Sequence, residues 1–440
     1  MRNVLIYNPQ PGPRSNYVFS FIFDDVLEWQ WKETTEYDTF FKSDGIKINY
    51  SGKNLDNAFN IPCHNFLNEK RVNVFEPSIG QFGDLPVLFP TEEPASINFD
   101  IFSAIFYMIS RYEEYLPEHT NQHGRYPVIQ SIAYRNKFID RPVVDEWIYA
   151  FATEIKKMFS DAVMPSRSFS FQPTIDIDNA FAFRHKGLIR SIGGFLRSLI
   201  ILDFAEISFR ARVLIGNRKD PYDTYNFIKS THRQLSLSPY IFILGGSYGK
   251  FDKNISNRNR HFRKLVIEAA TIGEIGLHPS YHSSLIHNIK SEKEHLEKIT
   301  GKKIRHSRQH FLMIKFPETY RMLIKAGITH DYSMGYSNCN GFRAGTCTPF
   351  YFYDLLEESR KDILIHPFHV IDVAFKHQDM SREESISQIE LIIDRVKSVN
   401  GVFVSVWHNE SLGNYKKWSG WKEVYKRLIK LAVHKTDPYE

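Results

Sequence analysis

Cysteine is scarce in this chain, and its three cysteines, Cys63, Cys339 and Cys347, form no CxxC pair. A sparse and odd set argues against a disulfide framework and is typical of proteins in a reducing compartment. No hydrophobic run is long enough to span a membrane, and the apolar stretch after Met1 is too short for the core of a signal peptide. We therefore expect a cytoplasmic protein.

The chain also lacks a long block of Lys or Arg, an internal repeat and a low-complexity tract. Its 56 basic and 50 acidic residues give a formal net charge of only +6, which argues against a nucleic-acid partner. A chain of 440 residues is longer than one that ordinarily folds around a single hydrophobic core, which indicates two domains. The polar stretch 161–168, which contains Pro165, is the predicted boundary between domains 1–165 and 166–440.

Apolar strands alternate with helical segments after the boundary, which predicts an α/β fold with a parallel sheet, open or closed as a barrel. Ser381 and Glu384 form a capping box that predicts the start of a helix. In the first domain Asp100 is the predicted cap of another helix. The predicted strands of the second domain, after the one that leads into Asp176, are Tyr240–Leu244, Glu274–Leu277, Ile304–Phe311, Ile328–Tyr332, Ile363–Pro367 and Val402–Trp407.

Polar residues cluster where these strands end, which is where ligands bind in parallel α/β sheets. Asp176 and Asp178 are two residues apart at one strand end, and like charges so close favour a cation or a basic partner between them. His278 and His282 share a face if the turn after Pro279 is helical. Two imidazoles and a carboxylate are typical of a catalytic zinc site. The alternatives are a solvated turn for the aspartates and a surface loop for the histidines.

Two further strand ends carry side chains suited to acid–base chemistry. Arg308 can hold an aspartate ionised through a charge-assisted hydrogen bond, although an ordinary salt bridge is the alternative. His408 ends the last strand and can act as a general acid, with Glu410 holding its ring, or it is a structural histidine.

The order of these motifs resembles the polysaccharide deacetylase (NodB homology) superfamily, also called carbohydrate esterase family four. The resemblance covers about Phe169 to Tyr425 and rests on Thr174-Ile175-Asp176-Ile177-Asp178, on His278-Pro279-Ser280-Tyr281-His282 and on Trp407-His408-Asn409-Glu410. The segments from Asn98 to Tyr115 and from Pro142 to Trp147 resemble an uncharacterised domain that precedes this barrel in Bacteroidetes proteins.

The resemblance implies a distorted (β/α) barrel behind a smaller α/β N-terminal domain, with a divalent metal, in the first place Zn²⁺. It implies that Asp178, His278 and His282 bind the metal. It also implies that Asp176 is the catalytic base, that Arg308 orients it and that His408 is the general acid. We expect the substrate to contact Tyr281, His310, Trp407 and Glu410. The sequence departs from the family in having Asp-Ile-Asp for adjacent aspartates, and Gln-His-Phe after Arg308 for the usual Pro-Tyr.

The implied reaction is the removal of N-acetyl or O-acetyl groups from a glycan or a lipid-linked sugar. A non-sugar amidohydrolase and a metal-free glycan-binding scaffold are the alternatives. An insertion at about 185–220 combines apolar residues with six Lys and Arg between Arg190 and Lys219. Such a basic amphipathic stretch favours peripheral contact with the inner membrane, unless its apolar face packs on the barrel.

Overall fold

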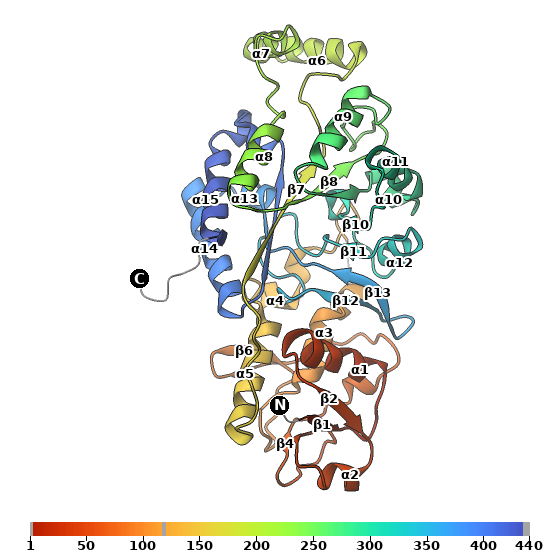
Figure 1. Ribbon diagram of the computed structural model, residues 1–440, viewed down its shortest axis with the longest axis vertical. Helices are drawn as coiled ribbons and strands as arrows, with labels where there is room; N and C mark the ends of the chain where they lie inside the picture. The colour runs from red at the N-terminus through yellow and green to blue at the C-terminus, as the bar shows by residue number, and fades with distance from the viewer. Residues whose placement is uncertain (1–2, 117–119, 434–440) are drawn as a thin grey trace.

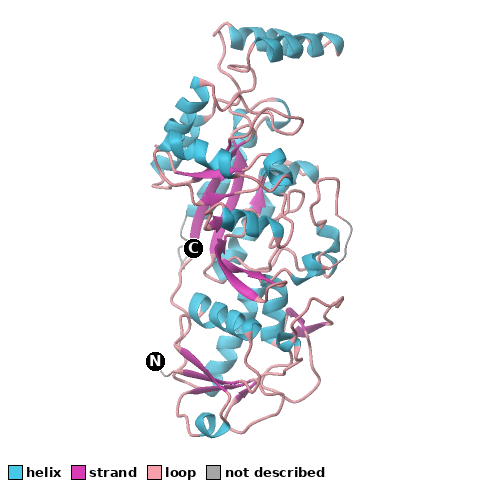
Figure 2. Ribbon diagram, turned by 90° about the vertical axis from the view of Figure 1, so that its right-hand side faces the viewer, coloured by secondary structure: helices cyan, strands magenta, loops and turns pink. Residues whose placement is uncertain are grey.

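The computed structural model describes residues 3–116 and 120–433. Two parts follow one another along the long axis of the molecule, with the N-terminal part at the lower end in Figure 1. The upper, larger part holds the main sheet with helices around it (Figures 1 and 2). No described helix is long and apolar enough to cross a membrane.

The N-terminal part is built on a four-stranded parallel sheet in the order β2-β1-β3-β4, beside an antiparallel hairpin of β5 and β6. Helix α3 is buried along its whole length, and the Asp100 side chain caps it by accepting from the Ser103 N–H, as predicted. The elements are β1 (Val4–Tyr7), α1 (Pro13–Ser20), η1 (Phe21–Val26), β2 (Trp31–Thr34), α2 (Tyr37–Phe41), β3 (Ile46–Asn49), β4 (Phe59–Asn60), η2 (Phe66–Asn68), β5 (Ile79–Phe82), β6 (Leu85–Leu88), α3 (Ile101–Ile109), η3 (Tyr112–Tyr115), η4 (Val128–Gln130), α4 (Ile132–Arg135) and α5 (Val143–Met158).

The C-terminal part alternates strands and helices, as its sequence pattern predicts. The predicted capping box of Ser381 and Glu384 opens α14. The elements are β7 (Ser170–Ile177), α6 (Leu188–Ile200), α7 (Phe204–Leu214), α8 (Tyr225–Gln234), β8 (Tyr240–Leu244), α9 (Arg260–Ala269), β9 (Glu274–His278), α10 (Tyr281–Leu285), α11 (Lys290–Thr300), β10 (His306–Ser307), η5 (His310–Leu312), α12 (Glu318–Lys325), β11 (His330–Asp331), β12 (Phe350–Asp354), β13 (Ser359–Ile365), β14 (Val370–Ile371), α13 (Asp372–His377), α14 (Arg382–Ser398), β15 (Val402–His408), η6 (Ser411–Gly413), η7 (Lys416–Trp418) and α15 (Trp421–Val433).

These strands form one sheet in the order β12-β13-β11-β10-β9-β8-β7-β15-β14, parallel except for β12. A separate apolar cluster joins Phe242 of β8, Tyr332 after β11 and Val406 of β15, so the sheet curls around an interior. The end strands β12 and β14 do not pair with each other in the described part of the chain. The fold is therefore a curled α/β sheet, and the closure expected of a barrel is not seen.

One predicted strand differs from the structure. Residues 304–311 were expected to be extended, yet only His306 and Ser307 form β10, and η5 begins at His310. Phe311 has a positive φ of 58°, which turns the chain away from the sheet. His310 lies beside His278 at the end of β9, with ring centres 5.0 Å apart.

Buried polar contacts join the two parts. Both carboxylate oxygens of Glu114 accept from Arg343, and Oε1 also accepts from Arg111 Nε at 2.8 Å. Asp145 of α5 accepts from the hydroxyls of Thr346 and Thr348. Buried apolar residues of both parts also belong to one continuous core.

Candidate metal centre and active-site cleft

The functional side chains lie at the carboxyl ends of neighbouring parallel strands. Asp176 and His408 are register partners on β7 and β15. Asp178 follows β7 directly, and His278 is the last residue of β9. Parallel strands end at the same edge of a sheet, so the fold brings these four predicted residues together.

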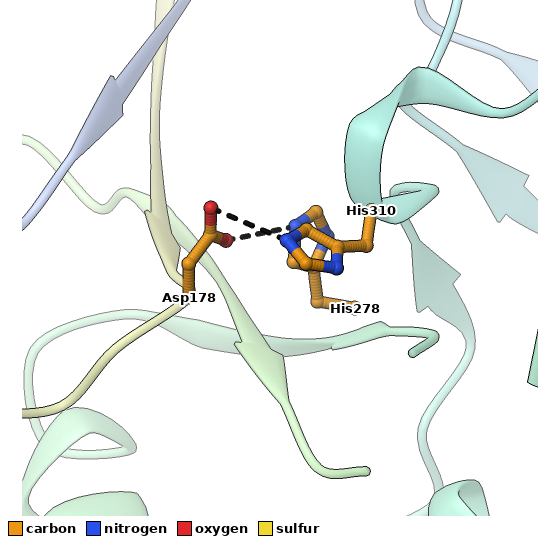
Figure 3. Close-up of side chains that lie close together, drawn as sticks. All are labelled: Asp178, His278 and His310. Atoms are coloured by element: carbon orange, nitrogen blue, oxygen red, sulfur yellow. Dashed lines mark ion pairs between the residues drawn. The ribbon is translucent and has the colours of Figure 1, made fainter. Parts of the chain in front are cut away.

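Asp178, His278 and His310 form a cluster in which one ligand atom of each lies within 4.8 Å of the others (Figure 3). Oδ1 of Asp178 is 3.0 Å from Nε2 of His278, and Oδ2 is 3.5 Å from Nε2 of His310. One carboxylate and two imidazoles are the donor set of many catalytic zinc sites. Within residues 3–116 and 120–433, no other group of three ligand residues converges in this way.

Hydrogen bonds fix the two imidazole rings so that Nε2 of each faces Asp178. The His278 Nδ1–H donates to the carbonyl oxygen of Arg308 at 2.6 Å. Nδ1 of His310 contacts Oδ1 of Asp252 at 3.0 Å. Metal-binding histidines are commonly oriented in this way, by a carbonyl or carboxylate on the second ring nitrogen.

The electrostatics of the cluster also fit a cation. Burial alone would raise the pKa of Asp178, but His310 and His408 hold that pKa well below its ordinary value. Burial would lower the pKa of His310, yet Asp178 and Asp252 raise it to about 9. Oδ1 of Asp178 is buried and has no well-oriented hydrogen bond, despite its 3.0 Å approach to His278. Asp178 is thus held beside positive charge, and a divalent ion bound by Asp178, His278 and His310 would supply that charge in place of the proton on His310.

Asp176 forms a separate, fully buried ion pair with Arg308. Nη1 of Arg308 donates to Oδ1 of Asp176 at 2.7 Å and to Oγ1 of Thr174 at 2.7 Å. Nε of Arg308 donates to the carbonyl oxygen of Tyr332, and the guanidinium lies 4.5 Å from the centre of the Phe242 ring. This charge-assisted hydrogen bond fixes the direction of the Asp176 carboxylate.

Asp372 holds the ring of His408 beside Asp178. Nδ1 of His408 lies 2.8 Å from Oδ1 of Asp372, and Nε2 lies 3.7 Å from Oδ2 of Asp178. Burial opposes protonation of His408, but Asp372 and Asp178 outweigh it and raise the pKa to about 10. The ring therefore presents a protonated Nε2 to the cleft.

His282 does not join the cluster, which corrects the expected ligand set. The expectation required a helical turn from His278 to His282, but His278 ends β9 and the N-cap of α10 is Ser280. The two rings are therefore not on one helical face, and His282 is exposed in a neighbouring cavity. His310, expected to contact the substrate, takes the third position.

Trp407 was predicted to contact the substrate, and this prediction is wrong. Its indole is fully buried against Trp421 and Tyr425 and cannot reach a substrate. Glu410 does not hold His408, since Asp372 does so. Burial and the nearby Asp178 raise the pKa of Glu410 to about 7.

The cleft in front of the cluster has a volume of about 310 Å³. It is lined by Asp176, Asp178, His278, His310 and His408, and also by Gln122, His123 and Arg125 of the N-terminal part. Nη1 of Arg125 donates to the carbonyl oxygen of Phe311 at 3.0 Å and to Oγ of Ser337 at 2.8 Å. The N-terminal part therefore forms one wall of the cleft.

A second cavity of about 1080 Å³ adjoins this wall. Tyr281 and Phe251 line it with ring centres 4.3 Å apart, and the Tyr281 hydroxyl lies 3.2 Å from Nδ1 of His123. Asp252, which orients His310, also lines this cavity. The two hollows thus share a border of aromatic and histidine side chains.

Three contributors were not singled out from the sequence. Asp372 directly follows β14, so the strand-end criterion that identified His408 also applies to it. Asp252 and Arg125 lie in loops with no such local signal, and only the folded chain brings them to His310 and Phe311.

The sequence comparisons match residues 4–160 to a family of unknown function (DUF7033). This match covers the N-terminal part and does not reach the candidate metal centre. Among curated proteins there is no significant match.

Solved structures with some likeness to the chain are described as deacetylases or as a CE4 family pseudoenzyme. A protein of Mycobacterium smegmatis described as a polysaccharide deacetylase is 14% identical, with a TM-score of 0.41 over 62% of this chain and 86% of that chain. The peptidoglycan deacetylase PdaC of Bacillus subtilis is 13% identical, with a TM-score of 0.29 over 61% and 86%. A CE4 family pseudoenzyme of Bacillus anthracis is 11% identical, with a TM-score of 0.30 over 61% of each chain. At these values the likeness does not by itself assign the chain to a family.

Proposed function

We propose that the protein is a metal-dependent hydrolase that removes acetyl groups from an N-acetylated or O-acetylated sugar of a glycan or lipid-linked sugar. The observation that carries the proposal is the convergence of the Asp178–His278–His310 cluster, the Asp176–Arg308 pair and the His408–Asp372 pair on one cleft. Acyl hydrolysis needs an activated water, a polarised carbonyl and a proton donor, and these three groups match those needs.

Asp178, His278 and His310 would hold the metal, with Zn²⁺ the first candidate for this donor set. When bound, such an ion lowers the pKa of water and polarises a carbonyl oxygen. Asp252 and the Arg308 carbonyl group keep both Nε2 atoms directed at Asp178, so the ligand set is preorganised.

The remaining residues move protons. Asp176, which Arg308 orients, takes a proton from the attacking water. His408 then donates the proton on its Nε2 atom to the departing nitrogen or oxygen of the sugar. Asp372 contacts Nδ1 of the same ring and so keeps Nε2 directed at the cleft. The base and the acid stand on neighbouring strands at the same register position and line the same cleft.

The shape of the site favours a glycan over a small amide. A small amide needs no more than the cleft of about 310 Å³. The adjoining cavity of about 1080 Å³ exceeds the roughly 300–1,000 Å³ of ordinary small-molecule pockets. Its aromatic side chains, Tyr248, Phe251 and Tyr281, offer flat apolar faces on which sugar rings can pack.

Metal analysis combined with an acetate-release assay on N-acetylglucosamine oligomers tests the proposal. Purified without chelator, the protein should contain close to one equivalent of divalent metal and release acetate. Asp176→Asn should lower kcat on the order of a hundredfold or more while the metal content stays unchanged. Metal-free protein that still binds the oligomers would instead identify a glycan-binding scaffold. Hydrolysis confined to simple acetamides would identify a non-sugar amidohydrolase.

A further inference from the structure

Helices α6 and α7 form a hairpin at the end of the molecule opposite the N-terminal part (Figures 1 and 2). In Figure 2 the hairpin lies across that end, beyond the helices that surround the sheet. The two helices pack on each other, and Arg210 of α7 fills the space beside Gly194 of α6. We call residues 188–215 the hairpin.

The hairpin exposes many apolar side chains. Leu188, Ile189 and Ile200 of α6 are 79%, 88% and 81% exposed. Further exposed apolar side chains are Ile192, Leu196, Leu199, Ile201, Leu202, Phe204, Leu214 and Ile215. On α6 they recur at three- and four-residue spacing, so they form one face. The alternative, in which this apolar face packs on the barrel, is therefore not what the described chain shows.

Basic residues are concentrated in the segment that carries this apolar face. Residues 184–219 contain eight Lys and Arg and only two acids, Asp203 and Glu206, a net charge of +6. The whole chain also has a formal net charge of +6, so the acidic and basic residues outside this segment are equal in number. The positive charge of the protein is thus concentrated where its apolar surface is exposed, and Arg197 and Arg212 are themselves exposed.

We infer that the hairpin docks the protein onto a membrane rich in anionic phospholipid. A large exposed apolar surface marks an interaction site, and an accompanying cluster of Lys and Arg selects a negatively charged partner. Apolar insertion together with attraction to anionic headgroups is the binding mode of interfacial amphipathic helices. At about 1.5 Å per residue, α6 is about 20 Å long, short of the about 30 Å hydrocarbon core, so it lies in the interface.

The hairpin is attached to the body near the candidate metal centre. Arg190 of α6 donates to the carbonyl oxygens of Lys253 and Asn254 at 2.6 and 2.9 Å, directly after Asp252. On the other side, Glu206 of α7 contacts Nζ of Lys416 at 3.1 Å. Docking would therefore hold the loop that orients His310 close to the membrane, where a lipid-linked substrate lies. Only this last step rests on the proposed function.

Cosedimentation of the full chain with vesicles tests the docking directly. We expect binding to vesicles of equal parts phosphatidylcholine and phosphatidylglycerol, weak binding to phosphatidylcholine alone, and weakening at high salt. The double variant Ile189→Ser/Ile200→Ser should lower the partition coefficient at least about tenfold. Arg197→Gln with Arg212→Gln should lower it on the order of twentyfold, since each basic residue near an anionic surface contributes roughly fivefold.

Matched controls separate the hairpin from general surface effects. Ile129, 63% exposed in the N-terminal part, provides Ile129→Ser, and exposed Arg427 of α15 provides Arg427→Gln. Both should bind vesicles like the unchanged protein, and the metal content of every variant should stay constant. The inference is overturned by absent binding to anionic vesicles or by full binding of the Ile189→Ser/Ile200→Ser variant. It is also overturned if that variant abolishes self-association of the protein in solution, because the face would then bind a second copy.

Discussion

At the scale of single residues, the surroundings of His310 and His282 differ more than their places in the sequence suggest. His310 is buried between Asp178 and Asp252, whereas His282 is exposed on α10. Metal affinity depends on a ring that is fixed and faces the other ligands, and only His310 meets both conditions.

We therefore expect His310→Ala to lose the bound metal and the hydrolytic activity. His282→Ala is the matched control and should keep both, because its ring lies outside the cluster. Metal content by mass spectrometry after dialysis measures the difference. The ligand assignment would be wrong if His282→Ala lost the metal and His310→Ala kept it.

Asp252 should act through His310 without binding the metal itself. Asp252→Asn keeps the shape of the side chain but removes the charge that faces Nδ1 of His310. Changes of this kind lower metal affinity by roughly 10- to 100-fold, so the apparent dissociation constant for Zn²⁺ should rise by that factor. Titration against a competing chelator gives this value, and an unchanged affinity would show that the ring is oriented by other contacts.

At the scale of elements, three histidine rings lie in a row across neighbouring strands, since β10 and β11 begin with His306 and His330 and His366 directly follows β13. His330 lies 3.0 Å from His366, whose ring stacks on Tyr332 with centres 4.3 Å apart. Burial, together with His330 and His306, lowers the pKa of His366 to about 3. The ring is therefore neutral in the folded protein over the whole physiological range.

This neutral histidine predicts a loss of stability in acid. Below pH 6.5 the unfolded chain protonates His366 and the folded chain does not, so the free energy of unfolding falls until about pH 3. The slope is at most about 1.4 kcal/mol per pH unit. The raised pKa of Asp331, about 6 through burial, acts in the opposite sense, so a variant must isolate the effect.

His366→Phe keeps a ring against Tyr332 and removes the titrating group. Urea unfolding at pH 7 and pH 5 should show a smaller loss of stability on acidification for this variant than for the unchanged protein. Equal losses would mean that His366 takes up a proton in the folded state.

At the scale of the whole molecule, the N-terminal part supplies one wall of the cleft. Arg125 lines the cleft and bonds to Phe311 and Ser337 of the C-terminal part. Arg125→Ala should lower kcat/KM about tenfold or more, mainly through KM, with metal content unchanged. Arg135→Ala, which removes an exposed ion pair with Glu76, is the control and should be neutral. If KM stayed unchanged in Arg125→Ala as well as in Arg135→Ala, the N-terminal wall of the cleft would not contribute to substrate binding.

The two parts should also unfold together, because Glu114 links them through Arg111 and Arg343. All three side chains are at most 3% exposed. Glu114→Ala leaves the buried guanidinium of Arg343 without its carboxylate partner, while Arg111 keeps its ion pair with Glu113, and this costs on the order of 3–5 kcal/mol. Denaturant unfolding should show one transition shifted to lower denaturant. Two separate transitions in the unchanged protein would contradict this coupling.

Local patterns in the sequence determined much of the molecule. Strand ends marked Asp176, Asp178, His278 and His408, because parallel strands present their last residues at one edge. Capping residues such as Ser381 marked helix starts for an equally local reason. Apolar periodicity with excess basic charge also indicated an amphipathic segment at about 185–220.

Only the tertiary structure decided which side chains complete the site. The turn at Phe311 brings His310, in place of His282, to Asp178, and no local pattern reveals where a turning chain comes to lie. Burial likewise removed Trp407 from the cleft, since the face of a strand that becomes interior depends on the elements packed on it. Arg125 reaches the cleft from another part of the chain, because contacts between residues far apart in sequence arise only on folding.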